Sequence, residues 1–149
     1  MKQIPARIAV GLLLLAPFGS LLTGRASATK AHEAQEALQH APTDAASIAA
    51  GEKSFEKFCV PCHGASGHGD GPAGAGLKPP PRDFTLAKNM KSANDGEVFD
   101  VIKNGGASEK LSPMMPAWGG LSKTQIWQLV AYIRGFPARD SLAKANAKK

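Results

Sequence analysis

Apolar residues recur at helical spacing in three stretches of this chain beyond residue 44. In the first stretch Ile48, Phe55 and Phe58 share one face with Gly51, which predicts a helix over residues 45–58. A glycine inside a helix costs roughly 1 kcal/mol relative to alanine. Gly51 therefore indicates a place where another helix approaches this one closely.

The other two stretches each open on a capping box, in which a polar side chain and a Glu or Gln three residues later each bond the other's backbone N–H. Asn94 and Glu97 begin a predicted helix over residues 94–104. Ser122 and Gln125 begin the clearest helix of the chain, whose apolar residues follow the i, i+3, i+4, i+7 pattern. The local sequence thus predicts where both helices start.

Segments rich in glycine and proline separate these helices, and residues 64–81 form the longest of them. The loop contains a G-x-G-x-x-G match at residues 69–74, but no apolar strand precedes it, so no dinucleotide site is predicted. Few strand signals occur, which predicts an all-α fold of short helices and long loops over residues 45–137. Such a domain has little core of its own, and a buried prosthetic group would supply an apolar centre.

Residues 1–28 show the three regions of a secretory signal peptide. Lys2 and Arg7 give a positive start, an apolar run follows over residues 8–22, and small residues precede a predicted cleavage after Ala28. We therefore expect export to the periplasm. The alternative is an uncleaved membrane anchor, although the run is short for a bilayer span of about 20 residues. No membrane span is expected after cleavage.

The charge of the mature chain is only mildly basic. Loss of Lys2, Arg7 and Arg25 with the signal peptide lowers the formal net charge from +6 to +3. This charge permits docking to an acidic protein, whereas no block of basic residues with interleaved aromatics points to nucleic acid. Residues 29–44 are predicted to form a tail or linker, and residues 138–149 a basic C-terminal tail.

The candidate chemistry lies in Cys59-Val60-Pro61-Cys62-His63, which directly follows the first predicted helix. C-x-x-C-H is the pattern for covalent attachment of a c-type haem. Each thiol can bond one vinyl group, and the histidine can bind the iron. Cys59 and Cys62 are the only cysteines of the chain. A structural zinc site needs four ligands and a thioredoxin-like pair needs a βαβ setting, so the sequence predicts one haem c.

The axial ligands of the iron follow from this attachment. His63 is the predicted ligand on one side, and its other ring nitrogen should donate to a backbone carbonyl. Pro72 is the predicted carrier of that carbonyl, or else a simple turn residue.

Met115, directly before Pro116, is the predicted ligand on the other side, where a thioether raises the reduction potential. Methionine is also a common core residue, and Met114 lies beside it. Ligation by a second histidine is a further alternative, for which the candidates are His32, His40 and His68.

With these motifs the chain resembles the class I monohaem c-type cytochromes of bacterial, periplasmic type, over residues 45–136. The resemblance is carried by Gly51-x-x-x-Phe55, C-x-x-C-H, Met115-Pro116-Ala117-Trp118-Gly119 and the run from Gln125 to Arg134. It implies a cytochrome c fold in which the first and last helices cross.

The same resemblance implies that Gly51 and Phe55 pack on Leu129 and Tyr132, and that His63 and the methionine of Met-Pro are the axial ligands. It also implies that Trp118 contacts the haem propionates. Arg82 is either a second such contact or a solvated charge.

The function expected from these observations is electron transfer without bond chemistry, and therefore not an enzyme activity. One haem would take an electron from a donor protein and pass it to an acceptor, through transient and partly electrostatic docking that Lys78, Lys88 and Lys123 could steer. One alternative is a bound subunit of a dehydrogenase or oxidase complex. A haem protein with an open iron site for a small molecule is another, against which a methionine ligand argues.

Overall fold

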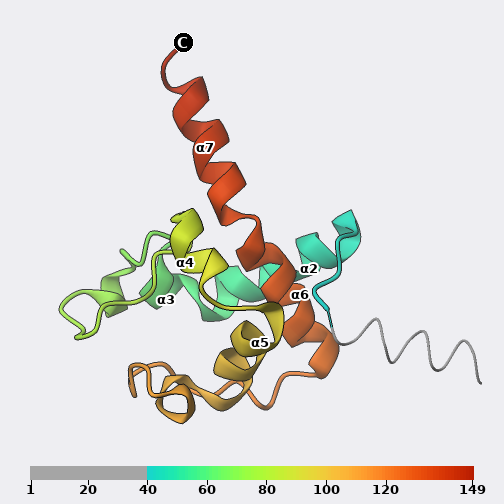
Figure 1. Ribbon diagram of the computed structural model, residues 1–149, viewed down its shortest axis with the longest axis vertical. Coiled ribbons are helices and arrows are strands. Elements are labelled where there is room, and N and C mark those ends of the chain that lie inside the picture. Colours follow the sequence, from blue (N-terminus) through green and yellow to red (C-terminus); the bar gives the residue numbers. More distant parts are fainter. Residues whose placement is uncertain (1–39) are drawn as a thin grey trace, which may run out of the picture.

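The computed structural model describes residues 40–149, and every regular element in that part of the chain is a helix (Figure 1). The all-α prediction is therefore confirmed. The elements are α2 (Ala45–Phe58), α3 (Val60–His63), η2 (Pro72–Gly74), α4 (Ala87–Lys91), α5 (Asp95–Asn104), η3 (Gly106–Glu109), α6 (Lys123–Arg134) and α7 (Phe136–Asn146).

The predicted signal peptide and most of the predicted linker lie outside the described residues. None of the helices within residues 40–149 is long and apolar enough to cross a membrane.

Helices α2 and α6 form the most extensive packing between elements of the fold. Gly51 lies at their contact, where an added Cβ would lie only 2.6 Å from the carbonyl carbon of Gln128 and 3.0 Å from the Cβ of Tyr132. One turn further on, the Phe55 ring is fully buried and packs on Tyr132 with ring centroids 5.4 Å apart. The expected crossing of the first and last cytochrome helices is present, and Leu129 belongs to the same buried cluster.

The predicted helix starts are confirmed by their caps. Asn94 and Glu97 exchange side-chain and backbone hydrogen bonds at the start of α5, and Ser122 and Gln125 do the same at the start of α6. Asp44 accepts the Ser47 N–H at 2.8 Å and caps α2. These bonds satisfy N–H groups that have no partner inside a helix.

Arg134 ties the end of α6 to the segment between α4 and α5. Its Nε donates to Asp95 Oδ1 at 2.7 Å, and its terminal nitrogens donate to the carbonyl oxygens of Met90 and, at 2.6 Å, Ala93. The second oxygen of Asp95 accepts the Ala41 N–H at 3.4 Å. The end of the predicted linker is therefore bonded to the helical body.

The C-terminal segment corrects the prediction of a basic tail after residue 137, since it forms helix α7. Proline is compatible with the first turn of a helix because the N–H that it lacks would have no partner there, and Pro137 occupies that turn. Phe136 anchors the start of α7 in the core, with only 3% of its surface exposed. The C-terminal part of α7 extends away from the body (Figure 1).

Candidate functional site

The C-x-x-C-H motif lies on one helical turn. Cys59 ends α2 and immediately precedes α3, and the His63 N–H donates to the Cys59 carbonyl at 2.9 Å. Residues three apart on a helix lie on the same face, so the two thiols are neighbours. Both cysteines are free and partly buried.

Burial disfavours the thiolate form of Cys59. Burial, with a smaller contribution from the neighbouring Cys62, raises the pKa of Cys59 to about 12. Metal ligation and disulfide exchange both use the thiolate, which this environment suppresses. Across residues 40–149 no three His, Cys, Asp or Glu side chains gather as a metal site.

His63 has one ring nitrogen engaged and the other free to bind iron. Its Nδ1–H donates to the carbonyl oxygen of Arg82 at 3.2 Å. Burial lowers the pKa of His63, and the Arg82 carbonyl opposes that effect only in part. The ring is thus held neutral with its Nε2 lone pair available, which is the form that metal ligation requires.

The carbonyl that accepts from His63 belongs to Arg82 and not to Pro72, which corrects the prediction for that bond. Pro72 begins the short turn η2, which is the alternative role that the sequence left open. Every residue carries a carbonyl, so no sequence signal marks the one that a histidine will use.

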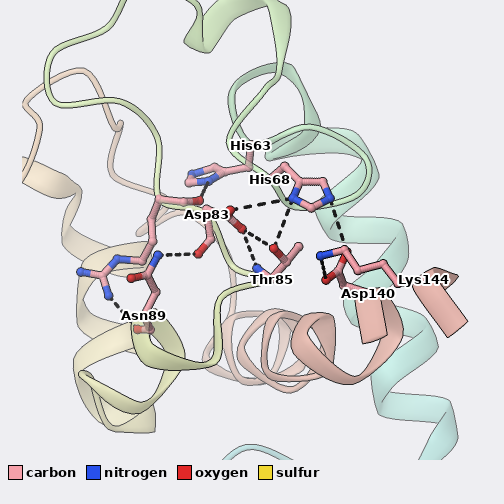
Figure 2. A network of polar contacts seen from close by, with 8 residues as sticks. His63, His68, Asp83, Thr85, Asn89, Asp140 and Lys144 are labelled. Carbon is pink, nitrogen blue, oxygen red and sulfur yellow. Dashed lines mark hydrogen bonds and ion pairs between the residues drawn. The ribbon is translucent and has the colours of Figure 1, made fainter. Parts of the chain in front are cut away.

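Residues 82–85 form a turn that is fixed by side chains on both sides (Figure 2). Asp83 Oδ1 accepts from the backbone N–H of Thr85 at 2.8 Å and from its hydroxyl at 2.6 Å, and the Asp83 carbonyl accepts from Asn89 Nδ2 at 2.8 Å. The ring of Phe84 stacks on His63 with centroids 4.5 Å apart. The turn therefore fixes both the position and the orientation of the His63 ring.

Asp83 and Arg82, the two charged residues of this turn, differ in burial and in the groups that they contact. Partial burial of Asp83 opposes its ionisation, but the hydrogen bonds from Thr85 and the nearby His68 outweigh burial and lower the pKa of Asp83. The Arg82 guanidinium is exposed and donates to the Asn89 carbonyl at 3.0 Å and to Ser92 Oγ at 3.3 Å. Arg82 thus holds the C-terminal end of α4 and is not simply a solvated charge.

The two methionines after η3 have different surroundings. Met115 is partly buried and packs against the hydrophobic core, whereas 62% of Met114 is exposed. The backbone of Met115 is fixed at both ends, since its N–H donates to Ser112 at 3.2 Å and its carbonyl accepts from Gly106 at 3.1 Å. Met115 is thus the methionine held against the interior.

Trp118 connects this methionine loop to the end of α2. The Trp118 ring packs on Phe58 with centroids 5.0 Å apart. The backbone N–H of Trp118 donates to the Ile102 carbonyl at 2.9 Å. Because Phe58 directly precedes Cys59, the loop and the C-x-x-C-H turn meet at the same end of α2. Two cysteine thiols at C-x-x-C spacing, an imidazole nitrogen and a thioether fit a haem c.

A family model described as cytochrome c oxidase, cbb3-type, subunit III, matches residues 46–133. The chain belongs to this cytochrome c family. Its cofactor is accordingly an iron-containing haem c, covalently bound through Cys59 and Cys62, and the predicted resemblance to class I monohaem cytochromes is confirmed.

A solved structure supports the same fold for this cytochrome. It is a chain of the Kuenenia stuttgartiensis reducing HAO-like protein complex Kustc0457/Kustc0458, with 28% sequence identity and a TM-score of 0.52. The match covers 64% of this cytochrome and 46% of that chain, so this cytochrome spans less than half of that relative's length. No curated protein sequence matches.

The remaining histidines of the cytochrome are engaged elsewhere or not described. His68 contacts Thr85 at 3.2 Å and lies 3.6 Å from Asp140. His40 lies beside the start of α5, at a surface hollow that it shares with Asn94 and Asp95. His32 is outside the described residues. The contacts of His68 thus engage both of its ring nitrogens.

Proposed function

We propose that this cytochrome is a periplasmic electron-transfer protein that carries one electron on haem c, with His63 and Met115 as the axial ligands. The haem supplies an iron that changes between two oxidation states. The residues of the chain hold that iron, exclude water from it and present it to redox proteins. The observation that carries the proposal is the pairing of a neutral His63, whose Nε2 is free, with a core-facing Met115.

Histidine with methionine ligation is characteristic of electron carriers and raises the reduction potential. Two protein ligands leave no open position for a small molecule, so the chemistry at the iron is electron exchange. The thioether is neutral and soft, and therefore favours the reduced iron. The exposure of Met114 and the packing of Met115 against the core favour Met115 as the ligand.

Export is supported by the sequence of residues 1–28, which has the order of regions of a signal peptide. Outside the cytoplasm, two free thiols usually form a disulfide. Haem attachment gives Cys59 and Cys62 a different use in such a compartment. N-terminal sequencing of the purified cytochrome should begin at Thr29, and a mature protein that begins at Met1 would contradict export by cleavage.

Docking to donor and acceptor proteins is expected to be transient and partly electrostatic. Lys78, Lys88 and Lys123 are exposed and could steer an acidic partner. A second candidate function is a bound subunit of a redox complex. It is favoured by the two comparisons, since one names an oxidase subunit and the other a protein complex. Copurification with membranes or a larger complex would support the subunit, and a free periplasmic protein would support the carrier.

The ligand assignment is tested by absorption spectroscopy of the haem-loaded protein. We expect a sulfur–iron charge-transfer band in the oxidised protein and no carbon monoxide binding after reduction. Met115→Ala should remove the band and lower the potential, whereas the matched variant Met114→Ala should keep both. Loss of the band in Met114→Ala alone would move the ligand to Met114, and ready carbon monoxide binding by the unmodified protein would overturn the carrier function.

A further inference from the structure

Electron transfer through His63 and Met115 makes no use of His68, yet both ring nitrogens of His68 face polar groups. Nδ1 lies 3.2 Å from Thr85 Oγ1. The single hydroxyl hydrogen of Thr85 is already donated to Asp83 Oδ1 at 2.6 Å. Thr85 can therefore only accept from His68, so Nδ1 carries a hydrogen and the neutral ring has its lone pair on Nε2.

That lone pair faces a carboxylate. Nε2 lies 3.6 Å from Asp140 Oδ1, and Nδ1 lies 3.8 Å from Asp83 Oδ2. A lone pair opposite a carboxylate oxygen is repelled, whereas an N–H⁺ at the same atom is attracted. Figure 2 shows His68 between Asp83 and Thr85 on one side and Asp140 on the other. The contacts thus place a carboxylate oxygen opposite Nε2.

Other charged groups also bear on His68. Lys144 donates to the second oxygen of Asp140 at 2.7 Å and balances part of its charge. The guanidinium of Arg139 lies 4.2 Å from the centre of the Tyr132 ring. Arg139 and His68 line one surface hollow, so the positive charge of Arg139 repels a positive charge on His68. Asp70 lies two residues along the same loop. Besides the Thr85 hydroxyl, the carboxylates of Asp83 and Asp140 lie within 4 Å of the ring nitrogens.

Water can reach this imidazole. The side chain of His68 is 38% exposed, and it lines a surface hollow of about 300 Å³ together with Ser66, Phe136 and Asp140. Histidine is the side chain that changes charge between about pH 5 and pH 8. Solvent therefore reaches the ring of His68 without any rearrangement of the core.

One short turn connects His68 to the haem ligand. Asp83 and Thr85 contact His68, while the Arg82 carbonyl accepts from His63 and the Phe84 ring stacks on it. The turn is also bonded to the loop that carries His68, since the Phe84 N–H donates to the Gly67 carbonyl at 2.7 Å. Charge on His68 is thereby transmitted to the group that orients His63.

We infer that His68 is a positioning residue whose protonation, through the Arg82–Thr85 turn, makes the reduction potential of this cytochrome fall as the pH rises. The inference rests on the proposed electron-transfer function. The electron comes from the donor protein and the proton from water, and both leave again on oxidation.

Two effects act in the same direction. A proton on His68 adds a positive charge that disfavours the oxidised iron. Loss of that proton leaves the turn more negative, which strengthens the hydrogen bond from His63 Nδ1 to the Arg82 carbonyl. A stronger bond makes the imidazole a better donor to the metal, and this favours the oxidised state. Reduction is therefore accompanied by proton uptake at Nε2 of His68.

The test is a redox titration of the haem-loaded protein from about pH 5 to pH 9 at constant ionic strength. The unmodified protein and the control His40→Gln should show the same fall of potential with pH, and His68→Gln should lose it. Asp140→Asn removes the carboxylate that faces Nε2, so in this variant the fall of potential should move to lower pH. This second variant keeps the test decisive if His68→Gln does not fold.

A potential that does not change with pH, or an equal slope in the unmodified protein and in His68→Gln, would overturn the inference. The outcome for the carrier function is read separately, from the sulfur–iron band and the absence of carbon monoxide binding in the same samples. Failure of those two signatures would count against the proposed function, whereas an intact band with unaltered pH dependence would count against His68 alone.

Discussion

Replacing Gly51 by alanine should separate the two helices on which the fold depends. The added methyl group would lie 2.6 Å from the carbonyl carbon of Gln128, where carbon atoms pack at about 3.5–4.0 Å. The contact is with the backbone of α6, so no side-chain rotation can relieve it. The carbonyl oxygen of Gln128 lies closer still, and the Cβ of Tyr132, at 3.0 Å, is also fixed to that backbone.

The magnitude follows from two opposing effects. Alanine favours a helix interior by about 1 kcal/mol over glycine. Overpacking of a well-packed core costs about 1–3 kcal/mol, occasionally more. Here α2 and α6 would have to move apart by about 1 Å, which also loosens the fully buried Phe55 and Val130. Because the contact is with backbone, the overpacking cost lies at the upper end of its range, about 3 kcal/mol. We therefore expect a net loss of about 2 kcal/mol in the free energy of unfolding, or roughly 10 °C in Tm.

The assay is denaturant unfolding of the haem-loaded protein, followed by helical circular dichroism. Gly51→Ala should lower the midpoint with little change in slope. Gly120→Ala is the matched control, because an added Cβ there has no neighbour within 4 Å, and it should stay within about 0.5 kcal/mol of the unmodified protein. Equal or higher stability of Gly51→Ala would refute the close helix contact.

Two further substitutions test polar contacts. Arg134→Gln should lower the free energy of unfolding by about 2–3 kcal/mol, because hydrogen bonds to Asp95 and to two carbonyl oxygens are lost together; Lys123→Gln, at an exposed position, is the control, and equal stabilities would contradict this role. Asp83→Asn should be less stable than the unmodified protein above about pH 4. The folded-state pKa of Asp83 lies below its usual value, so the difference in stability between variant and unmodified protein should vanish as the pH falls through that pKa. A stability difference that persists unchanged at lower pH would contradict the role of the Asp83 carboxylate.

The features that could be predicted from the sequence are those encoded by neighbouring residues. The capping boxes at Asn94 and Ser122, the apolar face of α6 and the C-x-x-C-H turn each lie within a few residues. Gly51 was informative because glycine is costly in a helix, so its presence indicated a close contact.

The features that could not be predicted depend on contacts between distant segments or on groups that every residue carries. His68, Asp83 and Asp140 come from three separate parts of the chain, and no periodicity relates them. The acceptor for His63 is a backbone carbonyl. Helix α7 was missed because Gly135 and Pro137 are typical of a helix end, although proline is equally compatible with the first turn of the next helix.

The choice between Met114 and Met115 shows how burial can distinguish residues that are adjacent in sequence. Met114 and Met115 are adjacent, so their distances along the chain from His63 cannot decide which of them binds the iron. Side chains of consecutive residues in a turn point in different directions, so a loop held in one position can direct only one of the pair inward. The bonds of Met115 with Gly106 and Ser112 hold the loop in such a position. They leave Met114 facing solvent, and the proposed iron ligand is therefore the methionine whose backbone is already fixed against the core.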